Sequence, residues 1–182
     1  RKTPTVLVPY DFGPKAKTAL QEAIKVADFI KGQIYLLSVL QASNFFTELF
    51  KSEKQQREER RHVENKLKEV ILETRKTYHG NIRYIVEHGS PAEVILEQAQ
   101  IRNAQYIIMG KMSSTVSAFH FIGPLTMHII ASAPCPVITV SENSIENGRF
   151  DNILLPIDLS KQTLEKINAA ISWAKYYKST VH

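Results

Sequence analysis

The sequence contains one cysteine, Cys135, and no long hydrophobic run. A lone cysteine excludes an internal disulfide, and Cys135 lies in "APCPV" without a second thiol or a nearby histidine. We therefore interpret it as a packed structural thiol of a protein from a reducing compartment. No apolar stretch approaches the ~20 residues that a membrane helix requires, so the sequence predicts no membrane partner.

Sequence patterns typical of catalysis are also missing. The six histidines show neither H-E-x-x-H nor Cys/His metal spacing. The sequence contains no G-x-S-x-G nucleophile elbow and no G-x4-GK[S/T] phosphate loop. It therefore predicts no catalytic residues and no metal site, and we expect a protein that is not an enzyme.

The net charge of +5 is mild, and the basic residues concentrate in one segment, residues 51–76. In this segment nine Lys or Arg alternate with six Glu, which is typical of a solvated helix rather than of a nucleic-acid surface. We expect no nucleic-acid partner. The helix either carries an interaction surface, led by the aromatics of "NFFTELF" at 44–50, or simply covers a sheet.

Short apolar runs of strand length alternate with amphipathic segments of helical spacing along residues 1–140. This alternation predicts a mainly parallel sheet with helices on both faces. Such sheets bind ligands beyond the carboxyl ends of their strands, here in the loops after Tyr10 and Met109. The predicted strands are 5–10, 33–40, 82–87, 104–110 and 135–140, and the predicted helices are 14–32, 47–78, 89–101 and 124–132.

Residues typical of helix ends flank two of these segments. Pro14 suits the first position of the first helix and Gly32 suits its C-terminal cap. Ser90, Pro91 and Glu93 have the spacing of a capping box, with proline in the first turn.

The C-terminal part of the chain repeats its beginning. Residues 153–182 align without gaps on residues 6–35 at an offset of 147, with seven identical pairs of thirty. A β-α unit with the first residues of another strand cannot bury its own apolar face. We expect a first domain at 1–140, a linker at 141–150, and the truncated start of a second domain of the same fold at 151–182. The parent protein is then expected to contain tandem domains.

Several stretches of the chain resemble the universal stress protein family: "VLVPYDFG", "LLSVL", "HGSPAEVILEQAQ", "AQYIIMG" and "SAPCPVITV". The resemblance covers residues 4–140 and begins again at 151. It implies a Rossmann-like α/β fold of the adenine nucleotide alpha hydrolase-like type, with five parallel strands in the order 3-2-1-4-5. It also implies a homodimer or a tandem pseudo-dimer joined through the fifth strands, and a cytoplasmic role in stress survival.

Family members that bind ATP are similar in a G-x2-G-x9-G-[S/T] pattern after the fourth strand. This pattern falls here on Gly110, Ser113, Gly123 and Pro124, so two of its four positions depart. Glycines let the backbone approach phosphates, and a helix N-terminus offers free N–H donors. Pro124 has neither a hydroxyl nor an N–H, but it is a favourable first residue of a helix.

The resemblance implies that the rest of such a site comes from Pro9, Asp11, Val39, Met109 and Leu125. Asp11 and the backbone near Pro9 would meet the adenine or ribose, and Val39 would contact the base through its main chain. Met109 and Leu125 would line the phosphate path with Gly110 and Gly123. Asp11 is equally well explained as a cap of the following helix.

Two main functional hypotheses remain open. The first is a non-catalytic, dimerising stress-response module in which nucleotide binding is weak or absent. The second is a switch that binds ATP at the 110–125 loop. Phe119, Phe121 and Ile122 make that loop more apolar than a phosphate site requires, so they either admit a different ligand or close the pocket.

Overall fold

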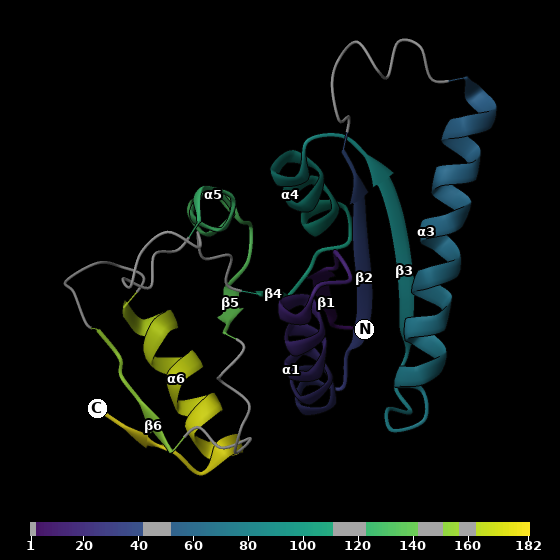
Figure 1. Ribbon diagram of the computed structural model, residues 1–182. Coiled ribbons are helices and arrows are strands. Elements are labelled where there is room, and N and C mark those ends of the chain that lie inside the picture. The colour runs from purple at the N-terminus through teal and green to yellow at the C-terminus, as the bar shows by residue number, and fades with distance from the viewer. Residues whose placement is uncertain (1–2, 42–51, 111–122, 142–150, 157–162) are drawn as a thin grey trace. The chain divides into compact units, whose positions relative to one another are not determined.

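The computed structural model describes residues 3–41, 52–110, 123–141, 151–156 and 163–182 of the chain. The chain forms two compact units, residues 1–142 and 143–182. The described elements of the first unit are β1 (Thr5–Pro9), α1 (Pro14–Ile30), β2 (Gln33–Leu40), α3 (Glu53–Thr74), β3 (Ile82–His88), α4 (Pro91–Ile101), β4 (Tyr106–Gly110), α5 (Pro124–Ser132) and β5 (Val137–Val140) (Figure 1).

The first unit is built on one parallel five-stranded sheet in the order β3-β2-β1-β4-β5. The central strands are apolar on both faces because helices cover both, so Val6, Leu7 and Val8 are all fully buried. This confirms the predicted α/β fold and its strand order. Because all five strands run the same way, their carboxyl ends meet at one edge of the sheet.

The helices divide between the two faces of the sheet. Helix α1 contacts β1, β4 and β5, and α3 contacts β2 and β3. Side chains of α4 and α5, including Val94, Ile95 and Ile129, form a core cluster with Leu7 and Ile107 of the sheet. Figure 1 shows α3 and α4 on opposite sides of β2 and β3.

The charged helix is shorter than the sequence predicted. Its described part begins at Glu53, where Ser52 and Gln55 form a capping box, and it ends at Thr74 rather than Tyr78. The chain turns after Thr74, and Tyr78 is buried at 2% exposure beyond the helix end. Residues 47–51 of the predicted helix lie outside the described residues.

Two predicted helix ends are wrong in detail. Helix α4 begins at Pro91 after Ser90, but no side-chain hydrogen bond caps it, so the predicted capping box is absent. At the end of α1 the left-handed residue is Lys31, with φ of 54°, and not Gly32. Gly32 is required for a different reason, since a Cβ there would lie 2.8 Å from the Pro4 carbonyl oxygen.

The second unit contains β6 (Asn152–Ile153), α6 (Thr163–Tyr177) and β7 (Thr180–Val181). Strands β6 and β7 are parallel, pairing Asn152 with Thr180 and Ile153 with Val181. In β1 and β2 the pairs are Thr5 with Gln33 and Val6 with Ile34, the same register at the offset of 147.

Two further features of β1-α1-β2 recur in the second unit. Lys178 has φ of 57° at the end of α6, as Lys31 does at the end of α1. The Thr180 N–H donates to the Asp151 carbonyl at 2.9 Å, as the Gln33 N–H donates to Pro4 at 2.8 Å. The second unit therefore reproduces the opening β-α-β geometry of the first.

Candidate functional site

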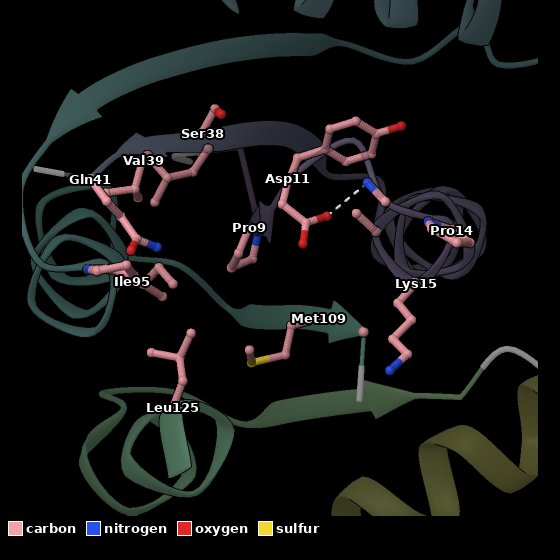
Figure 2. A pocket seen from close by; sticks show the side chains of 16 residues that line it. Pro9, Asp11, Pro14, Lys15, Ser38, Val39, Gln41, Ile95, Met109 and Leu125 are labelled. Carbon is pink, nitrogen blue, oxygen red and sulfur yellow. Dashed lines mark hydrogen bonds between the residues drawn. The ribbon is translucent and has the colours of Figure 1, made fainter. Parts of the chain in front are cut away.

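A cavity of about 330 Å³ lies beyond the carboxyl ends of β1, β2 and β4, and Figure 2 shows its side chains. A size of ~300–1,000 Å³ is typical of small-molecule sites. Most of its lining is apolar, with a few polar side chains among it. The lining residues are Pro9, Tyr10, Asp11, Gly13, Pro14, Lys15, Ala16, Leu37, Ser38, Val39, Gln41, Pro91, Ile95, Met109, Gly110 and Leu125.

Asp11 lies in the short loop between β1 and α1, and its carboxylate serves the backbone of that loop. The Gly13 N–H donates to Asp11 Oδ1 at 2.9 Å (Figure 2), and Gly13 is the N-cap residue of α1. The side chain therefore fixes the start of α1. Its other carboxylate oxygen accepts no hydrogen bond from a residue that the structure describes.

Phe12, the residue between Asp11 and Gly13, has a strained backbone conformation. Phe12 has φ of 67°, a left-handed conformation that is costly for a residue with a Cβ. Its ring packs edge-on against the Tyr10 ring with their centroids 5.4 Å apart, and the Lys66 ammonium of α3 lies 5.6 Å from the Phe12 ring centroid.

Tyr10 also lines the cavity. Burial and the neighbouring Asp11 carboxylate raise the pKa of Tyr10, so this phenol stays neutral at physiological pH.

Gly110 ends β4 directly against the first turn of α1. A Cβ at this position would lie 2.5 Å from Lys15 Cβ and 2.8 Å from the Lys15 backbone carbonyl. Carbon atoms in contact are normally ~3.5–4.0 Å apart. The packing of α1 on β4 therefore requires a glycine here, whether or not a phosphate approaches it.

Gly123 and Pro124 begin α5. Gly123 is the N-cap residue, with φ of −65°, and Pro124 occupies the first turn. No side chain caps this helix. Proline removes one of the N–H donors that a helix N-terminus would otherwise offer to an anion.

The structure brings together six of the nine residues that the sequence suggested for a nucleotide site. Pro9, Asp11, Val39, Met109, Gly110 and Leu125 all line the cavity. Gly123 and Pro124 do not line it, although they lead into Leu125. Ser113 lies outside the described residues, as do Phe119, Phe121 and Ile122 of the same loop.

Other residues line the cavity without having been suggested by the sequence, among them Lys15, Ser38, Gln41 and Ile95. Ser38 and Gln41 lie at the end of β2, and Ser38 is almost fully buried. The rule that ligands bind beyond strand ends could have pointed to both. Lys15 could not be found in this way, because the contact of the first turn of α1 with Gly110 is tertiary.

Cys135 precedes β5, and burial raises the pKa of its thiol to about 11. The thiol is therefore protonated at neutral pH, as expected for a structural cysteine. In the described part of the chain, no three His, Cys, Asp or Glu side chains gather as a metal site would require. Among the same residues, no helix is long and apolar enough to cross a membrane.

The doubly wound parallel sheet, with its cavity at the carboxyl ends of β1 and β4, defines a Rossmann-like α/β protein. The model of the universal stress protein family matches residues 2–141. The chain therefore belongs to the universal stress protein family.

Other known proteins are similar to the chain in sequence or in fold. A universal stress protein of Methanocaldococcus jannaschii is 25% identical over 148 residues, 75% of this chain and 81% of that protein. A functionally unknown protein of Pseudomonas aeruginosa PAO1 has a similar structure, with 18% identity and a TM-score of 0.69. The similarity covers 99% of this chain and 59% of that one.

A third protein is a universal stress protein whose crystal structure contains cAMP. It is 15% identical, has a TM-score of 0.52, and the similarity covers 78% of this chain and 99% of that one. At these identities the two solved structures establish the fold that they share with this chain.

Proposed function

We propose that this universal stress protein is a cytoplasmic, non-catalytic stress-response module that dimerises and binds ATP weakly or not at all. Universal stress proteins are generally non-enzymatic and often homodimeric. The observation that carries the proposal is the contact of Gly110 with Lys15. It explains the glycine of the suspected phosphate loop by packing alone, without a ligand.

Two further observations support weak ATP binding. Pro124 offers no N–H and no hydroxyl in the first turn of α5, where phosphates would need donors. Asp11 already accepts a hydrogen bond from Gly13, which explains its presence as a helix-start residue. The chain then keeps the frame of a nucleotide site but has lost two of its positions, at Ser113 and Pro124. The positions that it keeps are Pro9, Asp11, Val39, Met109, Gly110, Gly123 and Leu125.

The alternative is an ATP-binding switch. The cavity favours it, because six of the suggested residues line one hollow of nucleoside size. The universal stress protein crystallised with cAMP also shows that a protein of this fold takes an adenine nucleotide. In this alternative Asp11 binds the ribose or adenine through its other carboxylate oxygen.

Calorimetry with ATP and Mg²⁺ separates the two functions. We expect the unmodified chain to bind ATP with a Kd above about 1 mM, which corresponds to a binding free energy no more favourable than roughly −4 kcal/mol. The double variant Ser113→Gly/Pro124→Ser restores both replaced positions and is expected to bind ATP at least about tenfold more tightly. The first substitution lets the backbone approach the phosphates, and the second supplies an N–H and a hydroxyl.

The matched control for this experiment is Pro124→Ala, which regains the N–H but not the hydroxyl, in the Ser113→Gly background. Low-micromolar binding by the unmodified chain, lost in Asp11→Ala, would contradict weak binding and support the switch. Unchanged ATP affinity in the restored variant would show that the motif positions do not govern binding here.

We further propose that the chain dimerises, or forms a tandem pseudo-dimer, through β5. This strand is last in the sheet, so one of its edges has no partner strand in the described part of the chain. The Ile107 N–H donates to the Pro136 carbonyl at 3.1 Å, so by parallel alternation Ile138 also faces β4 and Thr139 faces outward.

Thr139→Pro is therefore expected to abolish the dimer while leaving the fold intact, because it removes only an outward N–H. Light scattering after size-exclusion chromatography measures the mass. The control is Ile138→Pro, which removes a bond within the sheet and is expected to lower stability instead. A Thr139→Pro variant that retains a dimer mass would refute pairing through β5.

The second unit, in our proposal, is the beginning of a second universal stress protein domain. Its strand register, its left-handed Lys178 and its Thr180 hydrogen bond match those of β1-α1-β2 at the offset of 147. Apolar side chains that are buried in the first unit are open here: Leu154 is 83% exposed, and its counterpart Leu7 is fully buried. In the Pseudomonas protein the similarity covers 59% of the chain, so that protein has further length beyond the part that resembles this chain.

A further inference from the structure

A second hollow lies on the other side of the first unit, between α3 and β3, away from the cavity at the strand ends. Its volume is about 470 Å³. The residues that line it are Lys68, Ile71, Leu72, Arg75, Ile82, Arg83 and Tyr84, and we call them the α3-β3 groove. Neither the sequence patterns nor the proposed function accounts for it.

The floor of the groove is apolar and partly open to solvent. Ile71 and Ile82 are buried at 7% and 2% exposure and hold α3 against the sheet. Leu72 is 64% exposed beside them. An apolar side chain left this open, next to a buried apolar pair, offers a contact for a further apolar side chain.

The groove also runs along an unpaired strand edge. Strand β3 is first in the sheet order, so β2 is its one partner among the described residues. The Ile34 N–H donates to the Asn81 carbonyl at 2.8 Å, and the Gly89 N–H donates to Leu40 at 3.1 Å. Odd-numbered residues of β3 thus face β2, and the backbone groups of Ile82 and Tyr84 face outward. Both of these residues line the groove.

The rim of the groove is basic. Lys68, Arg75 and Arg83 line it, and no acidic residue does. None of the three makes an ion pair with another residue that the structure describes. Arg83 donates only to neutral groups, Asn81 Oδ1 at 3.4 Å and the Tyr35 hydroxyl at 3.5 Å. Elsewhere on α3, Arg57 and Arg60 are paired with Glu53 and Glu64.

The positive charge of the rim also indicates which kind of molecule the groove binds. A second copy pairing through the same edge would bring a second basic rim close to this one, and like charges brought together at an interface are destabilising. Arg83 lies on the edge strand itself, and a charged side chain there discourages such self-association. A strand that carries carboxylates would instead find complementary charges on the rim and free donors and acceptors on the edge.

We propose that the α3-β3 groove binds an extended acidic segment of a partner protein, which adds to the sheet as a strand beside β3. Its backbone pairs with the outward groups of Ile82 and Tyr84. Successive side chains of a strand point to opposite faces, so one face of the segment points to α3. That face carries both an apolar side chain, which contacts Leu72 and Ile71, and the carboxylates that lie against Lys68 and Arg75. This inference goes beyond the proposed function and is independent of ATP binding and of β5.

The test uses the full chain and a short dye-labelled peptide, with fluorescence anisotropy measured at low salt. Every second residue of the peptide is valine or glutamate in turn, and the residues between them are serine, so that one face of the strand carries both the apolar and the acidic side chains. We expect saturable binding that weakens as salt is raised, because the rim charges are exposed. The double variant Lys68→Glu/Arg75→Glu is expected to bind roughly tenfold more weakly or not at all. The matched control Lys54→Glu/Arg57→Glu changes the net charge equally on the same helix, outside the groove, and is expected to retain binding.

Backbone pairing is tested separately with the same peptide N-methylated at alternate residues. Methylation that removes the N–H groups facing β3 is expected to weaken binding roughly tenfold while leaving the peptide charge unchanged. Equal loss in the two double variants, which would show nonspecific charge attraction, overturns the proposal. So does full affinity of both N-methylated registers, or no binding of the unmodified peptide at millimolar concentration. A chain that forms larger oligomers, lost in Lys68→Glu/Arg75→Glu, would assign the groove to a second copy and also overturn it.

Discussion

Gly110→Ala is expected to lower the free energy of unfolding by about 2–3 kcal/mol, although it adds a single methyl group. The new Cβ would lie 2.5 Å from Lys15 Cβ and 2.8 Å from the backbone carbon and oxygen of Lys15. Backbone atoms cannot rotate away as a flexible side-chain end can, so α1 must shift from β4. Urea unfolding followed by circular dichroism measures the effect as a lower midpoint with an unchanged slope.

The control for this prediction is Gly13→Ala, in the same part of the cavity. The added Cβ there would lie 3.0 Å from a side-chain oxygen of Asp11, and the φ of −72° suits alanine. We expect a cost below about 1 kcal/mol. If Gly110→Ala cost no more than Gly13→Ala, the packing explanation of Gly110 would fail, and a ligand-binding reason for this glycine would be restored.

Leu7→Ala is expected to destabilise the first unit by about 2–5 kcal/mol, whereas Leu154→Ala is expected to change stability by less than about 0.5 kcal/mol. The two leucines occupy equivalent positions of the repeat. Leu7 is fully buried between the helix layers, and Leu154 is 83% exposed. Thermal and urea unfolding of the two variants compares the two costs directly.

The same pair of variants tests the proposed second domain. In a chain that continues through a complete second domain, Leu154→Ala is expected to cost about as much as Leu7→Ala, because both would lie in a central strand. A Leu154→Ala cost that stayed near zero in the longer chain would contradict the equivalence of the two units.

The fold was predictable because its signals are local. Uninterrupted apolar runs of four to eight residues marked the buried parallel strands, and helical spacing marked the segments between them. The family resemblance supplied the strand order, and the pairing of β1 with both β2 and β4 confirmed it. The ends of elements were less predictable: Ser90 has the right type and spacing for a cap, but its hydroxyl makes no cap bond.

The candidate site was predictable only in its frame. Residues at strand ends, such as Asp11 and Met109, follow from the topology rule and the resemblance. The packing requirement for a glycine at Gly110 could not be predicted in this way. Lys15 is distant from it in the sequence, and the two residues meet only when α1 packs on β4. The α3-β3 groove was missed because its cations were counted with the solvated charges of α3, and only the structure separates the paired ones from the unpaired.

The left-handed lysines at the ends of α1 and α6 mark two places where this chain can be made more stable. Lys31 and Lys178 hold φ of 54° and 57°, conformations that glycine adopts without steric cost. The same left-handed geometry recurs at equivalent positions of both units, at the crossover from helix to strand. Neither lysine lines the cavity or the groove, so an engineer could introduce glycine at both ends and leave every proposed binding surface unchanged.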